Sequence, residues 1–448
     1  MCGIAGFCNF KENFEENTDY WNFRLEKMRA VLAHRGNDAR GRFLKKHIGL
    51  SHSRLAIRDI LCGDQPMTRT HNGYDYTICY NGEIYNTDEL IPELSENGFV
   101  CSTTSDTEVI LYAYIHWGAD FVSRLNGIFA FAIWDAAKNR LLLYRDRVGV
   151  KPLFYAIRDD SLVFGSEPKA CFAHPAVKPE LDKQGLQELL AIGPAHTSGL
   201  SLFKDLFEVL PGHFMIYSRD GLHDETYWEL TSREHTESYR DTVAHTRFLV
   251  EDAIKRQMVS DVPVCTFLSG GIDSSIVTAI AANYMNTRGK TLNTFSFDFK
   301  DNDRYFKANS FQPERDLPYV NRMLEEYETA HSYLECDENS LFKALFAAVD
   351  AKDMPGMTDV DSSLLYFCSL VSRKNKVALT GECADEIFGG YPWFYRKELL
   401  ERYGFPWSSD VAPRLALLRD DVALELDLSG YQAFRYEESR SKAPLLYG

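Results

Sequence analysis

Residues Val262–Ser275 have the sequence VPVCTFLSGGIDSS, in which an apolar run leads into a turn of glycines and serines. The run Val262–Leu268 is rich in β-branched and aromatic residues, which is typical of a buried strand. A helical pattern follows over Ser274–Tyr284. A strand that enters a glycine-rich turn and then a helix indicates a parallel α/β sheet, and such sheets bind their ligands at the carboxyl ends of the strands.

The turn carries the groups that a phosphate with a divalent metal requires. Glycines let the backbone approach an anion, serine hydroxyls and the helix N-terminus donate hydrogen bonds to it, and Asp273 offers a carboxylate to Mg²⁺. No lysine follows the glycines, so the turn is not a Walker A loop. A plain Gly-Gly turn is the structural alternative, but Asp273 and the two serines after it favour the phosphate site. The candidate phosphate-binding residues are Ser269, Gly270, Gly271, Asp273, Ser274 and Ser275.

A second stretch, Ala378–Tyr391 (ALTGECADEIFGGY), repeats the order of strand, glycine and acidic helix start. Carboxylates at a helix N-terminus are stabilised by the helix dipole without any further role, which is the structural alternative. Two carboxylate-bearing loops at strand ends of one sheet nevertheless suit a metal–nucleotide site. We therefore expect Asp273 and Asp385 to share a Mg²⁺ ion, which leaves Glu382 for acid–base chemistry.

The alternation of strands and helices extends on both sides of these loops. Further elements are expected at His245–Met258 (helix), Thr291–Phe297 (strand), Leu317–Tyr327 (helix) and Lys376–Leu379 (strand). Before them, Ser232–Arg240 (SREHTESYR) is polar and has no apolar stripe, so it is either linker or the start of the next helix. We therefore predict an α/β domain over residues 241–448, preceded by a linker over residues 219–240.

Residues 1–218 show a different pattern, with short aromatic and β-branched runs between Asn-Gly, Asp or Gly. Such runs predict antiparallel strands, and two helical stretches accompany them. The simplest layered solution places sheets inside and helices outside. The expected strands include Tyr76–Tyr80, Ile128–Trp134, Arg140–Tyr144 and Phe214–Tyr217, and the expected helices are Trp21–Ala33 and Asp106–His116.

The second residue, Cys2, becomes the first when the initiator methionine is removed, which generally happens before a small side chain. Its α-amine then lies beside its own thiol, and because an α-amine titrates near ~7.7–8, a useful fraction is free base at neutral pH. The amine can accept the thiol proton directly or through a water molecule, as in N-terminal nucleophiles. Cys2 is therefore the candidate nucleophile.

Further segments supply groups that would bind an amino acid. Arg54, in the strand-like HSRLAI, offers a guanidinium to a carboxylate. Asp106 is suited to cap a helix or to bind an α-ammonium group. Asn81-Gly82 is the commonest turn dipeptide, so a hairpin turn is one interpretation, and the other is an oxyanion hole made by the Asn81 amide and the Gly82 N–H.

Together these segments resemble the class II glutamine amidotransferases, whose N-terminal-nucleophile domain is an αββα sandwich that hydrolyses glutamine to glutamate and ammonia. The resemblance implies that Cys2 is the nucleophile and that Asn81 and Gly82 stabilise the oxyanion. It also implies that Arg54 binds the α-carboxylate of glutamine and Asp106 its α-amino group. The segments that carry the resemblance are Cys2-Gly3-Ile4, His34-Arg35-Gly36, Arg54-Leu55, Asn81-Gly82-Glu83, Ser105-Asp106, and Arg145-Asp146-Arg147 with Gly149 and Lys151-Pro152. The implied glutamine-binding residues are Arg54, Leu55, Ile57, Asn81, Gly82, Glu83 and Asp106.

The serine–glycine turn looks like the PP-loop of ATP pyrophosphatases, and the whole chain resembles the glutamine-dependent asparagine synthetases. In that family ATP adenylates the β-carboxylate of aspartate, and ammonia from the first domain reaches it through an internal tunnel. The resemblance implies ATP and Mg²⁺, with Asp273 and Asp385 as metal ligands and Glu382 supporting formation and amination of β-aspartyl-AMP. The implied ATP- and pyrophosphate-binding residues are Phe267, Ser269, Gly270, Gly271, Asp273, Ser274, Ser275, Phe297, Thr380 and Gly381.

The sequence departs from the family pattern at two places. Cys383 stands at a tight turn where the family has glycine. The family also carries C-terminal helices with a lysine that neutralises phosphate charge, and the sequence up to Gly448 has no match for them, so we expect the synthetase domain to be C-terminally incomplete. The alternatives are a truncated chain with glutaminase activity only, a related amide-forming ligase with another acceptor, and a non-catalytic module that senses glutamine or nucleotide.

Composition and charge exclude some classes of partner. The 448 residues include 49 Lys and Arg against 65 Asp and Glu, a net charge of −16 without a basic tract, which argues against nucleic acid and anionic membranes. No apolar stretch approaches the ~18–20 residues of a membrane span, and the N-terminus does not resemble a signal peptide. The ten cysteines lack metal-like spacing, so we expect mostly buried thiols in a reducing compartment. We expect a cytoplasmic enzyme acting on glutamine, aspartate and ATP, and a homodimer is one expected assembly.

Overall fold

The computed structural model describes residues 1–308, 314–408 and 410–442 and divides the chain into two compact units. The first unit consists of Met1–Ser232 and Arg414–Leu428, and the second of Arg233–Pro413 and Ser429–Gly448. The chain therefore passes from the first unit to the second, returns to the first with one short segment, and passes to the second again.

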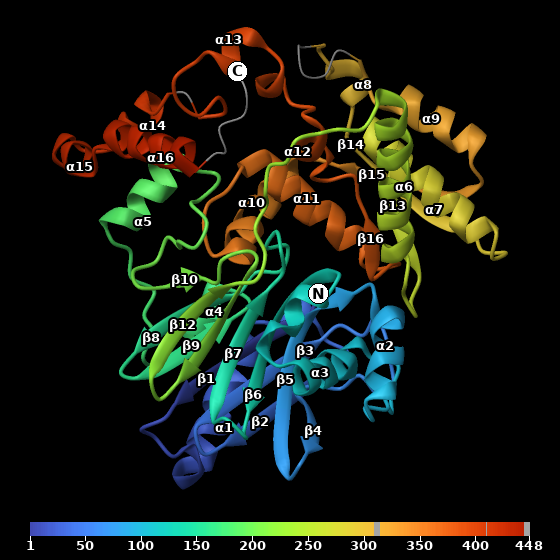
Figure 1. Cartoon of the computed structure of the whole chain (residues 1–448). Helices are drawn as coiled ribbons and strands as arrows, with labels where there is room; N and C mark the ends of the chain where they lie inside the picture. The colour runs from blue at the N-terminus through green and yellow to red at the C-terminus, as the bar shows by residue number, and fades with distance from the viewer. Residues whose placement is uncertain (309–313, 409, 443–448) are drawn as a thin grey trace. The chain divides into compact units, whose positions relative to one another are not determined.

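Two antiparallel sheets of six strands each form the centre of the first unit (Figure 1). One sheet has the strand order β10-β8-β9-β1-β3-β2, and the other has the order β12-β11-β7-β6-β5-β4. The strands are β1 Gly3–Asn9, β2 Ala39–Lys45, β3 Ile48–Arg54, β4 Met67–His71, β5 Tyr74–Ile84, β6 Gly127–Asp135, β7 Arg140–Arg145, β8 Phe154–Arg158, β9 Ser161–Gly165, β10 Phe207–Glu208, β11 His213–Ser218 and β12 Gly221–Thr226.

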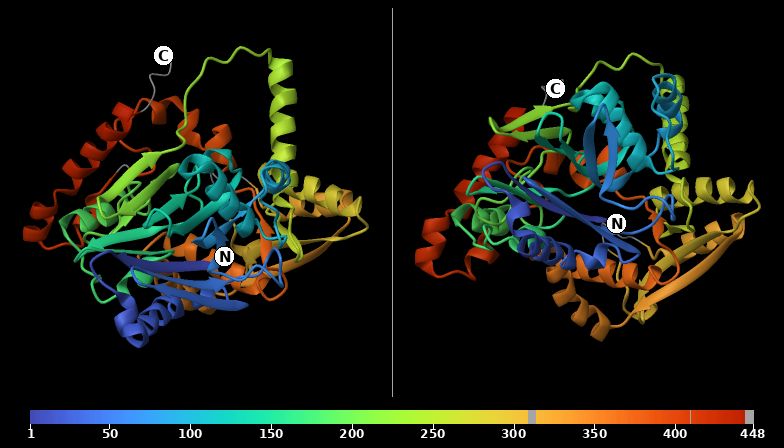
Figure 2. Two further views of the ribbon diagram at one scale, coloured as in Figure 1. Left: turned by 60° about the horizontal axis from the view of Figure 1, so that its bottom comes forward. Right: turned by 90° about the horizontal axis from the view of Figure 1, so that it is seen from below.

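Helices cover the outer faces of both sheets. The first helix, α1, packs on β1, β2 and β3, as the two views of Figure 2 show, whereas α3 packs on β4 and β5. The helices of this unit are α1 Thr18–Ala30, α2 Thr87–Glu96, α3 Asp106–Trp117, α4 Pro168–Phe172, α5 Lys183–Gln187 and α15 Asp420–Leu426, and α14 Ala412–Leu415 spans the point where the chain returns to the unit.

Three apolar layers hold the first unit together. Successive strand residues point to opposite faces of a sheet, so in β1 Ile4 and Cys8 lie between the two sheets while Ala5 and Phe7 face α1. A third layer lies between the other sheet and α3, where Phe131 packs with Tyr144. Burial on both faces explains the apolar runs of β1, β6 and β7. The αββα sandwich predicted for the N-terminal part is confirmed.

The structure places a strand inside the predicted linker. β12 pairs with β11 from Ser218 opposite Gly221 to His213 opposite Thr226, so it extends the second sheet beyond residue 218. This strand could not be predicted because β12 lies at the sheet edge and its later residues are exposed and polar, without the alternation of a half-buried strand.

A parallel sheet of four strands, in the order β15-β14-β13-β16, forms the second unit. Its strands are β13 Val264–Phe267, β14 Leu292–Phe299, β15 Thr329–Cys336 and β16 Val377–Leu379. Its helices are α6 Tyr239–Gln257, α7 Ile272–Asn286, α8 Asn302–Tyr305, α9 Leu317–Glu326, α10 Glu338–Lys352, α11 Thr358–Val371, α12 Ala384–Phe388, α13 Lys397–Leu400 and α16 Leu428–Lys442. Because β13 is flanked by β14 and β16 in parallel, the loops after these three strands open at one edge of the sheet. The predicted parallel α/β fold is confirmed.

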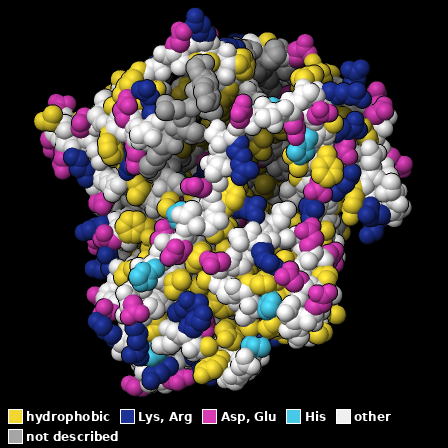
Figure 3. Space-filling model, in the orientation of Figure 1, with side chains coloured by type: hydrophobic (Ala, Val, Ile, Leu, Met, Phe, Trp, Pro, Cys, Tyr) yellow, Lys and Arg dark blue, Asp and Glu magenta, His cyan; other side chains and the backbone are white. Residues whose placement is uncertain are grey.

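Charged side chains of both signs are interspersed over the face shown in Figure 3. Within the described ranges, no helix is long and apolar enough to cross a membrane. All ten cysteines are free thiols, of which five are buried and three are exposed, so the expectation of mostly buried thiols holds for only half of them.

Candidate active site

A narrow cavity of about 30 Å³ lies beside Cys2 in the first unit. Seven residues predicted from the sequence line it, whereas Asn81 does not, although the neighbouring Gly82 of the same strand does. The lining residues are Cys2, Arg54, Leu55, Ile57, Arg58, Gly63, Gln65, Tyr80, Gly82, Glu83, Ser105, Asp106 and Thr107. The fold thus brings segments more than one hundred residues apart to one small space.

The main chain of Cys2 is fixed where β1 begins. Arg35 Nε donates a hydrogen bond to the Cys2 carbonyl at 2.9 Å, and Arg35 Nη1 donates to Glu167 Oε1 at 2.7 Å. Two residues further along the strand, the Ile4 N–H donates a hydrogen bond to Ser166 Oγ at 3.0 Å. The side chains of Arg35 and Glu167 are only 8% and 10% exposed, so a sheltered ion pair positions the backbone of the candidate nucleophile.

The thiol of Cys2 faces a backbone donor. The N–H of Leu55 lies 3.4 Å from Sγ. Burial raises the pKa of the Cys2 thiol, while the Leu55 hydrogen bond and the nearby α-amine lower it. The Leu55 N–H is therefore placed to stabilise a thiolate.

The α-amine of Met1 has an environment suited to a base. Burial lowers the pKa of this amine to about 6; the Cys2 thiolate opposes this shift, and the charges of Arg35 and Lys151 add to it. The amine is therefore mostly unprotonated at pH 7. This amine belongs to Met1, and after removal of Met1 the α-amine would be the nitrogen of Cys2 itself.

Asn81 and Gly82 lie inside β5, so the interpretation as a hairpin turn is wrong. Asn81 pairs with Ala130 and Gly82 with Phe129 of β6. A Cβ on Gly82 would lie 2.3 Å from the Ile128 carbonyl oxygen, so glycine here permits close packing of strands. The Asn81 Nδ2 is buried and has no hydrogen-bond partner among the residues that the structure describes. A buried donor in this state is available to a ligand.

Asp106 is the first residue of α3 and not its cap, which corrects one of the two roles expected for it. Ser105 is the cap, since its Oγ accepts a hydrogen bond from Thr107 N–H at 3.3 Å. The Asp106 carboxylate instead accepts hydrogen bonds from the Tyr80 hydroxyl at 2.8 Å and from Ile84 N–H at 3.1 Å.

Glu83 and Asp106 form a buried acidic pair at the cavity. Burial raises the pKa of Glu83 to about 8, the charge of Asp106 raises it too, and Arg58 opposes both effects. The pKa of Asp106 is raised by burial and lowered by Arg58. Two carboxyl groups that do not both ionise readily create a place where a cation, such as an α-ammonium group, is favoured.

Arg54 ends β3, and its guanidinium binds the loop of residues 58–64. Nη1 donates to the Ile60 carbonyl at 3.1 Å and to Asp64 Oδ1 at 3.0 Å, and Nη2 donates to the Asp59 carbonyl. The Asp64 side chain is 74% exposed, whereas that of Arg54 is 6% exposed. A substrate carboxylate could therefore replace Asp64 on Arg54 without disturbing the contacts of Arg54 with backbone carbonyls.

Arg58 and Gln65 also line the cavity, and neither was predicted from the sequence. Arg58 Nη1 donates to the Ile84 carbonyl at 2.9 Å and lies 4.0 Å from Asp106 Oδ2. Gln65 Oε1 accepts a hydrogen bond from Tyr80 N–H at 2.6 Å. Both residues lie in an irregular segment without a recognisable pattern. Only the positive charge of Arg58, which lies close to the candidate carboxylates, could have suggested that it is a site residue.

In the second unit, the serine–glycine turn joins β13 to α7. Gly270 has a φ of +90°, which L-residues with side chains rarely adopt. Ser274 Oγ accepts a hydrogen bond from Ser269 N–H at 3.2 Å and lies 3.0 Å from Ser269 Oγ. Gly271 is the N-cap of α7 and, as a glycine, offers no side chain to cap the first N–H groups of the helix.

Of the two carboxylates predicted to share a metal, Asp273 is affected by the charge of the other. Burial raises the pKa of Asp273, and so does the charge of Asp385. A Cβ on Gly381 would lie 2.7 Å from the Asp273 Cβ, so the loop after β16 touches the start of α7. No group of three or more His, Cys, Asp or Glu side chains within the described ranges is arranged to hold a metal. Two carboxylates still suit Mg²⁺, which commonly completes its shell with water and substrate phosphates.

Phe267 and Phe297 lie on the neighbouring strands β13 and β14. Both rings pack on Phe367 of α11, with centroid distances of 4.6 Å and 5.1 Å. Each is half-buried, so part of each ring belongs to the core of this unit. Thr380 and Gly381 follow β16 at the same edge of the sheet.

Glu382 and Cys383 complete the second loop. Both are exposed, and Cys383 has a φ of +71°, in the left-handed region. The backbone here therefore has the conformation that the glycine of the family pattern adopts without strain.

Two family models match the chain. Residues 1–228 match a glutamine amidotransferase domain, and residues 245–447 match asparagine synthase.

Relatives with both parts are also found. The chain is 46% identical to glutamine-hydrolyzing asparagine synthetase 3 of Bacillus subtilis (strain 168), over 100% of the chain and 72% of the relative. It is 32% identical to the putative glutamine-hydrolyzing asparagine synthetase 2 of Methanocaldococcus jannaschii, over 87% of the chain and 76% of the relative. It is also 32% identical to an amidase of Penicillium rubens, of whose length the alignment covers 62%. Among solved structures, the chain is similar to the glutamine phosphoribosylpyrophosphate amidotransferase of B. subtilis. The alignment covers 88% of this chain and 98% of that one, with 16% identity and a TM-score of 0.40.

Proposed function

Because this chain belongs to the family of glutamine-hydrolysing asparagine synthetases, we propose that it transfers ammonia from glutamine to ATP-activated aspartate. The products are asparagine, glutamate, AMP and pyrophosphate. The observation that carries the proposal is the Cys2 thiol, which faces the Leu55 N–H in a cavity lined by the acidic pair of Glu83 and Asp106.

In the proposed glutaminase step, the Cys2 thiolate attacks the side-chain amide carbon of glutamine. The α-amine accepts the thiol proton and delivers it to the departing ammonia. The unpartnered Asn81 Nδ2 and the Gly82 N–H stabilise the negative oxygen of the tetrahedral intermediate. Water then hydrolyses the thioester to glutamate.

The glutamine main chain is recognised by opposite charges. Its α-ammonium group binds at Asp106 and Glu83, where the buried acidic pair favours a cation. Its α-carboxylate binds Arg54 in place of Asp64. Leu55 and Ile57 lie along the same cavity and complete the proposed glutamine site.

In the proposed synthetase step, the β-carboxylate of aspartate attacks the α-phosphorus of ATP and pyrophosphate leaves. Ammonia then attacks the acyl carbon of β-aspartyl-AMP and AMP leaves. Adenylation is needed because a free carboxylate is a poor acyl donor to an amine. Glu382 supports both steps in this proposal.

The nucleotide is proposed to lie at the shared strand ends of β13, β14 and β16. Asp273 and Asp385 would hold Mg²⁺, which neutralises phosphate charge when bound. The residues proposed to contact ATP or its pyrophosphate are Phe267, Ser269, Gly270, Gly271, Asp273, Ser274, Ser275, Phe297, Thr380 and Gly381.

Glutamate release by Cys2→Ala tests the first step. Alanine is small enough to permit removal of Met1, so the variant should differ from the wild type only by the missing thiol. We expect it to keep its fold and to lose glutamine hydrolysis by at least about a thousandfold, as expected for loss of a nucleophile. Cys62→Ala, which removes an exposed thiol, should retain the wild-type rate. Full activity of Cys2→Ala, or of protein shown by mass spectrometry to retain Met1, would refute the assignment.

The acceptor is tested by incubation with glutamine, ATP, Mg²⁺ and each of a panel of amino acids. We expect AMP and an amide only with aspartate. A related amide-forming ligase with another acceptor is the second candidate, and amide formation with a different acid would support it. A location in the cytoplasm and a homodimer remain predictions, and light scattering after gel filtration measures the latter.

A further inference from the structure

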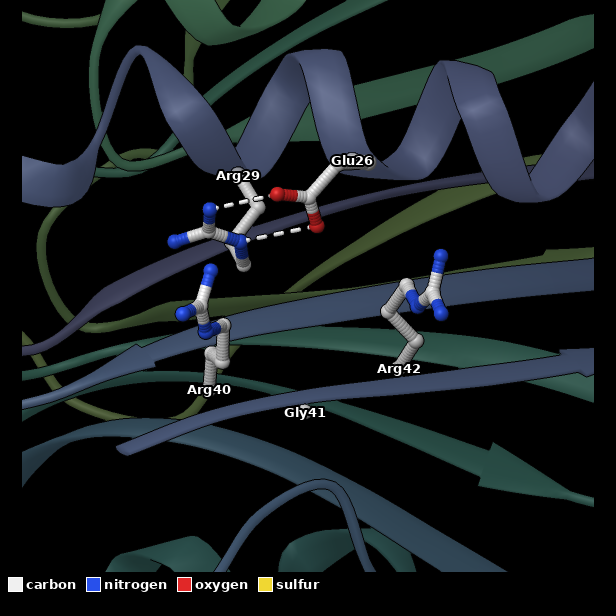
Figure 4. Close-up of a pocket in the computed structure, with 5 residues that line it drawn as sticks. All are labelled: Glu26, Arg29, Arg40, Gly41 and Arg42. Atoms are coloured by element: carbon white, nitrogen blue, oxygen red, sulfur yellow. Dashed lines mark hydrogen bonds and ion pairs between the residues drawn. The ribbon is translucent and has the colours of Figure 1, made fainter.

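A second cavity of the first unit lies between α1 and the edge strand β2 (Figure 4). Its volume is about 540 Å³. It is lined by Glu26 and Arg29 from α1 and by Arg40, Gly41 and Arg42 from β2, and none of these lines the cavity beside Cys2. We refer to it as the arginine pocket.

The two arginines of β2 approach the pocket from below in Figure 4. Arg40 and Arg42 are two residues apart on a strand, so their side chains leave the same face, about 7 Å apart at the backbone. Both are exposed. Neither side chain makes an ion pair or a hydrogen bond with any part of the chain that the structure describes. Two uncompensated positive charges therefore point at one hollow.

The side facing them carries an ion pair of its own. Arg29 Nε donates to Glu26 Oε2 at 3.0 Å, and Arg29 Nη2 donates to the other carboxylate oxygen. The hydrogen bond from Arg29 lowers the pKa of Glu26, and the charges of Arg42 and Arg40 lower it as well, which shows that their field reaches across the pocket. Three guanidinium groups face one carboxylate, so the pocket has a net charge of +2. The whole chain, by contrast, has a net charge of −16.

We propose that the arginine pocket binds a small oligophosphate, at a site separate from the proposed glutamine and ATP sites. Each guanidinium offers parallel N–H donors that match the oxygens of a phosphate group. Two such groups along β2 suit an anion with two linked phosphates better than a single monovalent ion. Charges on an edge strand also deter pairing between sheets, but that role requires no hollow facing a helix.

The arginines face away from the glutamine site. Gly41, between them, has its Cβ direction on the opposite face of β2, where an added Cβ would lie 1.9 Å from the Gln65 carbonyl oxygen. Gln65 lines the cavity beside Cys2. Substitution of Arg40 and Arg42 should therefore leave glutamine hydrolysis unchanged, which separates this proposal from the proposed function.

The test is calorimetric titration of the full chain with inorganic pyrophosphate in the presence of EDTA. The variant Arg40→Gln/Arg42→Gln is compared with Lys45→Gln/Lys46→Gln, which removes the same charge from the same hairpin outside the pocket. Any binding at the proposed PP-loop contributes equally to all three proteins. We expect the arginine variant to lose at least tenfold in affinity for one of the bound anions, while the lysine variant matches the wild type.

Equal binding by the arginine variant and the wild type would overturn the proposal, and so would an equal loss in the lysine variant, which would indicate general charge attraction. Citrate serves as a polycarboxylate of similar charge in a parallel titration. Tighter binding of citrate than of pyrophosphate at this site would overturn the assignment to phosphate. Circular dichroism of each variant confirms that the comparison is between folded proteins.

Discussion

We expect Glu83 to couple glutamine binding to proton release. In the empty site the pKa of Glu83 is raised to about 8, chiefly by burial, so it is largely protonated at pH 7. An α-ammonium group beside it stabilises the carboxylate and lowers this pKa. Glutamine binding should therefore release a proton below pH 8, and it should tighten as the pH rises from 6 to 8 and then level off.

This linkage is measurable with Cys2→Ala, which binds glutamine without turnover in the proposed mechanism. The apparent binding enthalpy at pH 7 should vary with the ionisation enthalpy of the buffer. Glu83→Gln should abolish this variation. If proton release persists in the Glu83→Gln variant, the released proton comes from another group.

Cys383 is expected to be a strained residue. Its φ of +71° costs an L-residue about 1–2 kcal/mol, whereas glycine adopts it freely but loses about 0.5–1 kcal/mol in unfolded-state entropy. Cys383→Gly should therefore stabilise the second unit by about 0.5–1 kcal/mol in urea unfolding. Cys383→Ala removes the thiol but keeps the side-chain strain, so it should bring no gain. A stabilising alanine would show that the thiol and not the backbone is responsible.

At the scale of single residues, the sequence predicted the site residues whose side-chain chemistry the reaction requires. Cys2, Arg54 and Asp106 meet at one cavity, although their roles remain predictions. Leu55 was predicted as a glutamine-binding residue, but the contact of its N–H with the Cys2 thiol could not be foreseen, because a backbone donor leaves no mark on residue type. The pair of Arg35 and Glu167 could not be foreseen either, because 132 positions separate the two partners.

The junction of β1 with the turn before β2 depends on Glu167. Burial raises the pKa of this carboxyl, but hydrogen bonds from His34, Arg35 and Lys169 outweigh it and hold the pKa at about 2. The group therefore contributes stability that is fully present above pH 4.5 and is lost as the pH falls from 4.5 towards 2. The shift corresponds to on the order of 3 kcal/mol.

Glu167→Gln should lower the unfolding free energy of the first unit at pH 7 and flatten its fall between pH 4.5 and 2. Urea titrations at several pH values, followed by a fluorescence signal of the first unit, measure both effects. An unchanged slope in the variant would mean that other carboxylates dominate acid unfolding.

Among the elements, strongly apolar strands were predictable and weakly patterned ones were not. The core strands β6 and β7 carry aromatic and aliphatic runs that are buried on both faces. β12 was hidden by its polar edge position, and Asn81-Gly82 favoured a turn by composition although close contact with Ile128 requires the glycine within a strand. α6 begins at Tyr239 and not at His245, because Ser238 caps it outside the apolar pattern.

At the scale of the whole molecule, the two chemistries are expected to be separable. Asp273→Ala should abolish Mg²⁺-dependent release of pyrophosphate from ATP and leave glutamine hydrolysis within twofold of wild type, because the two sites lie in different units. Asp303→Ala, an exposed carboxylate on α8, should affect neither. Both activities are measured on the same preparation. Loss of both in Asp273→Ala would contradict this independence.

The polypeptide crosses between its units three times, and this makes the first unit discontinuous in the gene. On the returning segment, residues 414–428, Arg414 donates hydrogen bonds to the Leu190 and Gly193 carbonyls at 3.1 Å and 2.9 Å. A fragment that stops at residue 232 would leave these two carbonyls without the hydrogen bonds from Arg414. To express the first unit by itself, residues 414–428 should be fused to residues 1–232 or added as a separate peptide, as in a split protein.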